Sequence, residues 1–110
     1  MFGVKIFTLY PDLYPGPLNT GIYKKAQENK IWDLKVINIR DYAVDKHSSV
    51  DDTPFGGGNG MLLRPDVVAS ALDSNLESNE TTIYLSPKGR KFDQRAAREF
   101  SKKKKLNLLC

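Results

Sequence analysis

Short apolar blocks alternate along this chain with segments that have the spacing of amphipathic helices. Strand-like blocks, in which apolar residues cluster or alternate, occupy residues 4–9, 32–39, 81–85 and 106–110. Helical segments are expected over residues 21–29, after residues 65–66, and over residues 93–103, with a polar loop over residues 74–80. Repeated strand–helix–strand units predict an α/β domain, a parallel sheet with flanking helices and right-handed crossovers.

Local residue choices support the expected helices. Asn19 or Thr20 can cap the first helix, Pro65 fits a first helical turn, and Asp93 can cap the last helix. In the first helix, Ile22 and Ala26 fall on one face. Trp32 could stack on a base, but because it opens an apolar strand we interpret it as a packing residue.

Composition places the chain among ordinary globular proteins. Its 110 residues are 40% hydrophobic and 27% charged, which suits one small domain. The net charge of +4 mildly favours an anionic partner such as RNA, although residues 102–105 alone supply four lysines at a predicted helix end. The single cysteine excludes an internal disulfide. No apolar run reaches membrane-spanning length, so no membrane association is expected and the default location is cytoplasmic.

The glycine-rich segment over residues 47–61 is the first candidate for chemistry. It holds four of the eight glycines, the adjacent Asp51 and Asp52, and the only histidine, His47. The segment lacks the Gly-Lys-Ser/Thr ending of a P-loop and does not follow the first strand as a dinucleotide motif would. From the residues alone, a ligand-contacting loop and a capped surface loop both remain open.

A second candidate segment begins where the third expected strand ends. Residues 84–89 (YLSPKG) lie at the carboxyl end of a parallel strand, where open α/β sheets bind ligands. The alternative is a plain Pro-Lys-Gly turn that joins a strand to a helix.

Several motifs, in order along the chain, resemble the bacterial tRNA (guanine-N1)-methyltransferase family, TrmD. The signature loop is matched by residues 51–61 (DDTPFGGGNGM), and further matches occur at residues 7–11 (FTLYP), 40–42 (RDY), 45–47 (DKH), 84–90 (YLSPKGR) and 92–94 (FDQ). One departure is Asn59, where proline or alanine is more typical of the family.

This resemblance implies a knotted fold of the SPOUT class, a homodimer, tRNA as substrate and S-adenosylmethionine as methyl donor. It implies a cofactor-binding wall made by Tyr84, Leu85, Ser86, Pro87 and Gly89. It implies substrate contacts by His47, Asp51, Gly57, Gly58 and Gly60. No catalytic residue and no metal ligand is assigned, because the family's general base is expected in the C-terminal half.

The family's essential Gly-Arg-Tyr-Glu-Gly turn would follow Cys110, the last residue of this sequence. We therefore expect residues 1–110 to be the N-terminal portion of the methyltransferase domain, truncated before the knot and inactive alone. The alternative is a non-enzymatic RNA-binding or structural remnant of a split gene. We also expect residues 106–110 to form an unpaired edge strand that promotes association.

Overall fold

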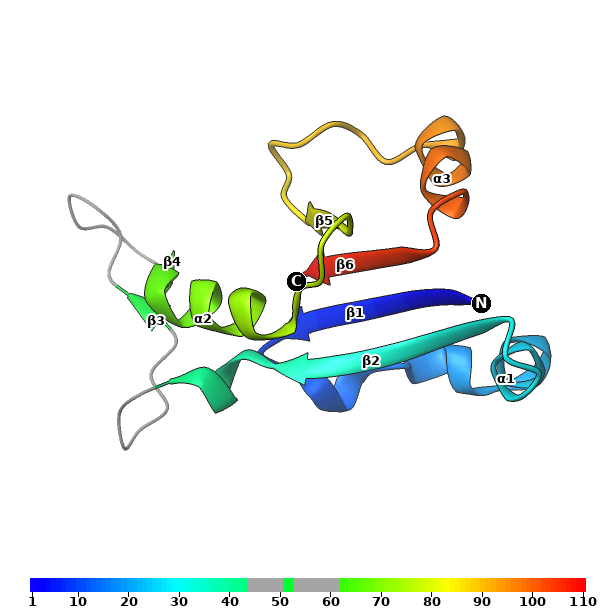
Figure 1. Ribbon diagram of the computed structural model, residues 1–110, viewed down its shortest axis with the longest axis horizontal. Helices are drawn as coiled ribbons and strands as arrows, with labels where there is room; N and C mark the ends of the chain where they lie inside the picture. Colours follow the sequence, from blue (N-terminus) through cyan, green and yellow to red (C-terminus); the bar gives the residue numbers. More distant parts are fainter. Residues whose placement is uncertain (44–50, 53–61) are drawn as a thin grey trace.

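The computed structural model describes residues 1–43, 51–52 and 62–110. Its main sheet contains β1 (Phe2–Thr8), β2 (Trp32–Asn38), β5 (Thr81–Tyr84) and β6 (Lys105–Leu109). The strand order is β2-β1-β6-β5, and every neighbouring pair is parallel (Figure 1). The prediction of an α/β fold with a parallel sheet is confirmed.

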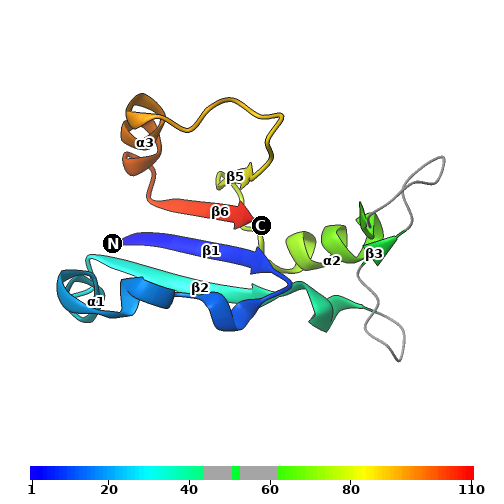
Figure 2. The same ribbon diagram turned by 180° about the vertical axis from the view of Figure 1, so that it is seen from behind.

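Within the described residues three α-helices accompany the sheet: α1 (Gly21–Glu28), α2 (Pro65–Asn75) and α3 (Gln94–Ser101). In the described part of the chain, short 3-10 helices lie between β1 and α1, as η1 (Pro11–Leu13) and η2 (Gly16–Asn19), and after β2, as η3 (Ile39–Tyr42). α1 and α3 lie at the end of the sheet where the strands begin, whereas α2 lies where they finish (Figures 1 and 2). Helices therefore cover opposite ends of the sheet.

The helix starts agree in part with the sequence prediction. Asp93 caps α3, since its Oδ1 accepts a hydrogen bond from the Ala96 N–H at 2.9 Å. Thr20 occupies the N-cap position of α1, but its hydroxyl donates to the Pro17 carbonyl at 2.7 Å and makes no cap bond. The side chain of Ile22 is 76% exposed, so the expected apolar face of α1 is not buried there.

Side chains alternate between two faces of the sheet, which we call the first and second faces. On the first face, Phe7 of β1 is paired with Ile37 of β2 and Leu109 of β6. Phe7 and Ile37 join Val67 and Ala71 of α2, together with Ile39, in the buried core cluster. The second face carries alternate residues such as Val4, Leu34 and Leu108, which point away from this core.

The expectation of an unpaired final strand is wrong. β6 pairs with β1 on one side and with β5 on the other, so β2 and β5 are the edge strands. The chain crosses from β1 to β2 first and later inserts its last strand between β1 and β5. Linear order along a sequence does not reveal such an insertion, since any strand can occupy the central position.

Two further details differ from the sequence prediction. The helix that begins at Pro65 extends to Asn75, so residues 74–75 belong to α2 and the polar loop is shorter. A small antiparallel ladder, β3 (Asp51–Asp52) with β4 (Leu62–Leu63), was not expected. Trp32 opens β2 half-buried, and its indole N–H donates to the Tyr23 carbonyl at 3.0 Å, which supports a packing role.

Candidate functional site

The segment after β5 forms a turn that its own backbone stabilises. The Leu85 N–H donates to the Leu109 carbonyl at 3.1 Å, which extends the pairing of β5 with β6 by one residue. The Ser86 hydroxyl accepts from the Lys88 N–H at 3.2 Å, and the Ser86 carbonyl accepts from the Gly89 N–H at 3.2 Å. Residues 84–89 are therefore held at the carboxyl end of the sheet, as the sequence predicted.

Tyr84 borders a shallow apolar groove at this end of the sheet. The groove, of about 330 Å³, lies on the first face, where Leu109 and the helix residues Pro65, Val68, Ala69 and Leu72 also line it. The side chains of Tyr84 and Leu85 are 63% and 55% exposed. Large apolar side chains this exposed at the edge of a groove offer contact area to a ligand or to another polypeptide segment.

Gly89 has no obvious conformational reason to be glycine. A Cβ built on it would lie 3.5 Å from the Ser86 carbonyl oxygen, which is an ordinary contact distance, and its φ is outside the left-handed region. Among the described residues, therefore, the turn itself would accept a side chain at position 89. A glycine there is consistent with close approach of a ligand to the backbone.

The β3–β4 ladder pairs the two acidic residues of the glycine-rich segment with the residues that follow that segment. Asp51 is paired with Leu63 and Asp52 with Leu62 in antiparallel register. β4 precedes the first turn of α2, and the ladder lies beyond the carboxyl end of the main sheet (Figure 1). Asp51 is thus placed at the base of this segment. The other predicted substrate residues, His47, Gly57, Gly58 and Gly60, lie outside the described residues.

A polar contact between Tyr14 and Cys110, at the carboxyl end of the main sheet, was missed by sequence reasoning. The Cys110 N–H donates to the Phe7 carbonyl at 3.0 Å, so the last residue is aligned alongside β1. A hydrogen bond with the Cys110 thiol raises the pKa of Tyr14 above its usual value, and burial raises it further, while a hydrogen bond with Thr8 opposes both. Tyr14 and Cys110 are 96 positions apart along the printed sequence, and no local pattern connects them.

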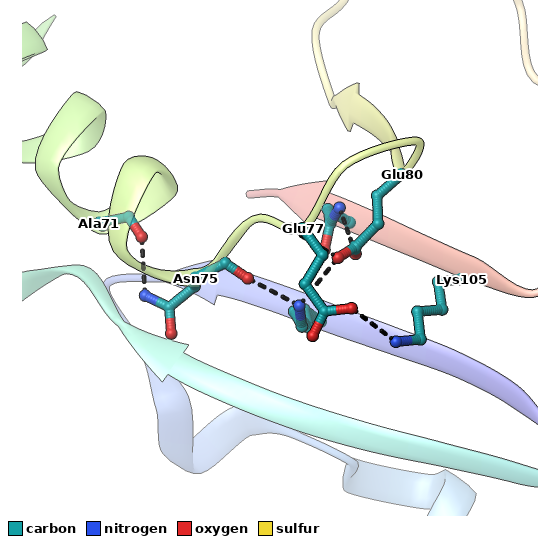
Figure 3. Close-up of polar contacts among 7 residues, drawn as sticks. Ala71, Asn75, Glu77, Glu80 and Lys105 are labelled. Carbon is teal, nitrogen blue, oxygen red and sulfur yellow. Dashed lines mark hydrogen bonds and ion pairs between the residues drawn. The ribbon is translucent and has the colours of Figure 1, made fainter.

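A polar cluster on the first face, near the start of the strands, was also missed (Figure 3). Glu80 is at its centre, with a side chain only 4% exposed. Its carboxylate accepts from Lys5 Nζ at 3.1 Å, from Asn107 Nδ2 at 2.9 Å and from the Glu77 N–H at 2.8 Å. Lys5 Nζ also donates to the Asn75 carbonyl at 2.7 Å. These bonds attach residues 75–80 to the sheet and so fix where β5 begins.

The charges of this cluster support one another. Burial tends to raise the pKa of Glu80, but the hydrogen bonds from Asn107, from the Glu77 backbone and from Lys5 outweigh burial and lower it. The ion pair between Glu77 and Lys105, at 2.8 Å, lowers the pKa of Glu77 and raises that of Lys105. Both carboxylates therefore stay ionised at neutral pH, which suits a structural clasp rather than an acid–base catalyst.

Comparison with known proteins identifies the family. The family model described as tRNA (Guanine-1)-methyltransferase TrmD matches residues 2–110. This chain belongs to the TrmD family. The resemblance drawn from the sequence motifs is thereby confirmed, and the loop and turn described above lie within the matched region.

Curated relatives agree with the family model over 97% or more of the chain. A tRNA (guanine-N(1)-)-methyltransferase of Pelagibacter ubique is 60% identical over 110 residues, covering 100% of this chain and 48% of the relative. Similarly named proteins of Wolbachia pipientis wMel and Carboxydothermus hydrogenoformans are 50% and 46% identical, covering 47% and 42% of their lengths. This TrmD-family chain spans about half the length of the curated relatives it matches.

The structure adds one finding on membranes and one on metals. In the parts of the chain that the structure describes, no helix is long and apolar enough to cross a membrane. Within residues 1–43, 51–52 and 62–110, no three His, Cys, Asp or Glu side chains are grouped so that they could hold a metal ion.

Proposed function

We propose that this chain is part of a methyltransferase that transfers a methyl group from S-adenosylmethionine to N1 of a guanine beside the tRNA anticodon. The observation that carries the proposal is the match of the TrmD family model to residues 2–110. The relatives that bear this activity in their names are about twice as long. The activity is therefore proposed for this chain together with the half of the relatives that it does not match, which we call the complementary half.

The reaction needs three things that the chain can supply only in part. N1 of guanine carries a proton, so methyl transfer requires a general base, a positioned base edge and a methyl donor close to N1. S-adenosylmethionine would supply the activated methyl group on its sulfonium. We assign no base within residues 1–110 and expect it in the complementary half.

Residues 84–89 are proposed as one wall of the cofactor site. Tyr84 and Leu85 present exposed apolar surface beside the groove over β6 and α2, which suits a flat adenine ring. Ser86, Pro87 and Gly89 form the turn that holds this wall at the carboxyl end of β5. The groove is open on one side, so the residues fit one wall of the site, and the complementary half would provide the other.

The glycine-rich segment is proposed as the substrate-binding loop. Asp51, at the base of the β3–β4 ladder, would order the loop or orient the guanine edge. His47 would contact the RNA, and Gly57, Gly58 and Gly60 would let the loop close over a nucleotide that has left its stack. The ladder and the turn at residues 84–89 both lie at the carboxyl end of the sheet, which supports a shared site.

The remaining proposals follow from the same family membership. We propose a cytoplasmic homodimer that acts on tRNA, in which residues 1–110 form the N-terminal portion of a SPOUT methyltransferase domain. The knot of that domain would be formed by residues of the complementary half. Net charge of +4 on this half is compatible with an RNA substrate.

The test is methyl transfer from labelled S-adenosylmethionine to unmodified tRNA. We expect no incorporation above a no-protein blank with the chain alone, and 1-methylguanosine in the presence of the complementary half of the Pelagibacter ubique relative. Gly89→Val should reduce the rate without unfolding the chain, whereas Lys88→Ala, next to it in the turn, should retain the rate. A complex of the two halves that binds tRNA but never methylates it would contradict the proposal.

A second candidate is a non-enzymatic RNA-binding or structural remnant of a split gene, for which the net charge of +4 would suffice. It predicts that the chain alone binds tRNA with an affinity that the complementary half does not change. Filter binding of labelled tRNA, with and without that half, separates the two candidates.

A further inference from the structure

The positive charge of this chain is concentrated in one segment. Residues 95–105 contain six Lys and Arg side chains against one Glu, whereas the other 99 residues contain eleven against twelve Asp and Glu. The net charge of +4 therefore comes from α3 and from the lysine run that follows it. A lysine run at a helix end can be explained by the helix dipole alone. The arrangement of these side chains in the structure decides between that explanation and a binding surface.

The cations of α3 project from its exposed side. Arg95, Arg98 and Lys102 are spaced i, i+3 and i+7, so they lie along one side of the helix and its C-terminal cap. All three are exposed, whereas Ala96 is only 4% exposed. The lysines at residues 103–104 continue the exposed surface into the connection to β6. We call these five cations the α3 basic surface.

Few carboxylates balance this surface. In the part of the chain that the structure describes, Glu99 pairs with Arg90 at 3.5 Å and Glu77 pairs with Lys105 at 2.8 Å. None of the five cations of the α3 basic surface forms an ion pair with a described carboxylate. Beside them is a polar hollow of about 430 Å³, lined by residues 77–80 and 102–105. The surface therefore presents uncompensated positive charge to an anionic partner.

The chemistry of the surface fits the phosphate backbone of an RNA. Lys and Arg are common partners of phosphate oxygens, and such contacts do not depend on the base sequence. The α3 basic surface has no ring on which a base could stack, and Phe92 and Phe100 stack on each other with their centroids 6.4 Å apart. A helix that lies on a membrane needs a free apolar side, but Ala96 of α3 is buried within the protein.

The α3 basic surface is separate from the proposed catalytic site. α3 lies where the strands begin, whereas the β3–β4 ladder and the turn at residues 84–89 lie at their carboxyl ends (Figure 1). β6 alone spans five residues between these ends, a length of about 15 Å.

We infer that the α3 basic surface binds the phosphate backbone of tRNA away from the nucleotide that is methylated. The inference rests on the proposed function for the identity of the RNA. A folded RNA extends far enough to reach both ends of the sheet. A backbone contact at α3 would raise the affinity and the rate of encounter without selecting the target base.

The experiment compares two triple variants that remove equal charge. The α3 variant combines Arg95→Gln, Arg98→Gln and Lys102→Gln. The control combines exposed positions of α1 and β2: Lys24→Gln, Lys25→Gln and Lys35→Gln. Filter binding of unmodified tRNA to each chain, without cofactor, is measured from about 0.05 to 0.2 M salt. Circular dichroism verifies that both variants are folded. Since no methyl transfer is measured, failure of this inference is distinguished from failure of the proposed function.

We expect the α3 variant to reduce the slope of log affinity against log salt by about 2–3, because each lost phosphate contact lowers the slope by about one. The control should change the slope by less than about one. A duplex RNA of unrelated sequence should show the same reduction, since backbone contacts do not read bases.

Equal slopes for the two variants, or no binding of tRNA by the unaltered chain, would overturn the inference. So would an unchanged tRNA slope for the α3 variant together with its loss of binding to vesicles of phosphatidylcholine and phosphatidylserine. A membrane surface would then be the partner of α3.

Discussion

The two faces of the central sheet are covered to different degrees by the rest of the described structure. On the first face, α2 packs over the carboxyl end, where Phe7 and Ile39 are completely buried, and the Glu80 cluster lies nearer the start of the strands beside a cavity of about 190 Å³. On the second face an open apolar groove, which we call the second-face groove, lies over Phe2, Val4, Trp32 and Leu108. The first face therefore combines a helix-covered apolar core with a polar cluster, whereas the groove on the second face is lined almost entirely by apolar side chains.

The polar cluster around Glu80 explains how buried polar side chains are accommodated on the first face. Asn107 is fully buried, and its Oδ1 has no hydrogen-bond partner among the described residues, although its Nδ2 bonds Glu80. Polar groups are tolerated on the first face because Lys5, Glu80 and Asn107 largely satisfy one another. Among the described residues that line the second-face groove there is no Lys, Arg, Asp or Glu, so no comparable network can form there.

The largest predicted effect is on the core of the first face. Phe7→Ala should lower the free energy of unfolding by about 3–5 kcal/mol, because it removes a fully buried ring and leaves a cavity. Leu13→Ala, at a position 66% exposed beside the second-face groove, should change it by no more than about 0.5 kcal/mol. Urea denaturation of both variants measures the contrast. Equal losses would show that the two faces contribute alike.

The next effect concerns the clasp at Glu80. Glu80→Ala leaves Lys5 and Asn107 without this partner and should cost about 1–3 kcal/mol of unfolding free energy. Glu99→Ala is the matched control, because its 3.5 Å ion pair with Arg90 is exposed and should be worth less than about 1 kcal/mol. The same urea titration applies. If Glu80→Ala lowers the free energy of unfolding no more than Glu99→Ala does, the Glu80 cluster does not stabilise the fold.

The interactions of the Glu80 carboxylate should also make the stability of the chain depend on pH in the acidic range. Since the folded-state pKa of Glu80 is below its usual 4.5, its stabilisation is present above pH 4.5 and is lost as pH falls through the lowered pKa. The stability difference between the unaltered chain and Glu80→Gln should therefore shrink between about pH 5 and pH 3. Urea midpoints at these two pH values test the sign. A difference that grows in acid would contradict it.

The smallest effect distinguishes the two helices beside the second face. Asp93→Ala removes the cap bond of α3 and should cost about 1 kcal/mol. Thr20→Ala, at the equivalent position of α1, should cost less, because the Thr20 side chain makes no cap bond with that helix. Thermal unfolding followed by circular dichroism compares them. A larger loss for Thr20→Ala would mean that its bond to Pro17 matters more than a helix cap.

Much of the fold could be predicted because its signals are local. Apolar periodicity located all four strands of the main sheet, Asp93 indicated the start of α3, and the motif at residues 84–90 indicated a segment at the end of β5. The family followed from spaced motifs and is confirmed by the family model over residues 2–110. These features depend on residues close together in the sequence, so they can be recognised without knowing the tertiary structure.

What could not be predicted depends on contacts between distant residues. The central position of β6, the bond of Lys5 to Glu80 across 75 positions and the Tyr14–Cys110 contact all arise only once the sheet is assembled. Ile22 on α1 shows that a local pattern can also mislead: its helical spacing predicted a buried side chain, but Ile22 is exposed in the structure. The predicted roles of Asp51, of Gly89 and of the glycine-rich loop remain predictions.

The most direct test of the difference between the two faces uses Trp32, the only tryptophan of the chain, which lies on the floor of the second-face groove. The emission of Trp32 and its quenching by acrylamide are recorded for the unaltered chain, folded and in urea. We predict that acrylamide quenches Trp32 in the folded chain, because the second-face groove leaves this side chain half-buried beside open space. Emission at short wavelength with almost no quenching in the folded chain would contradict the account.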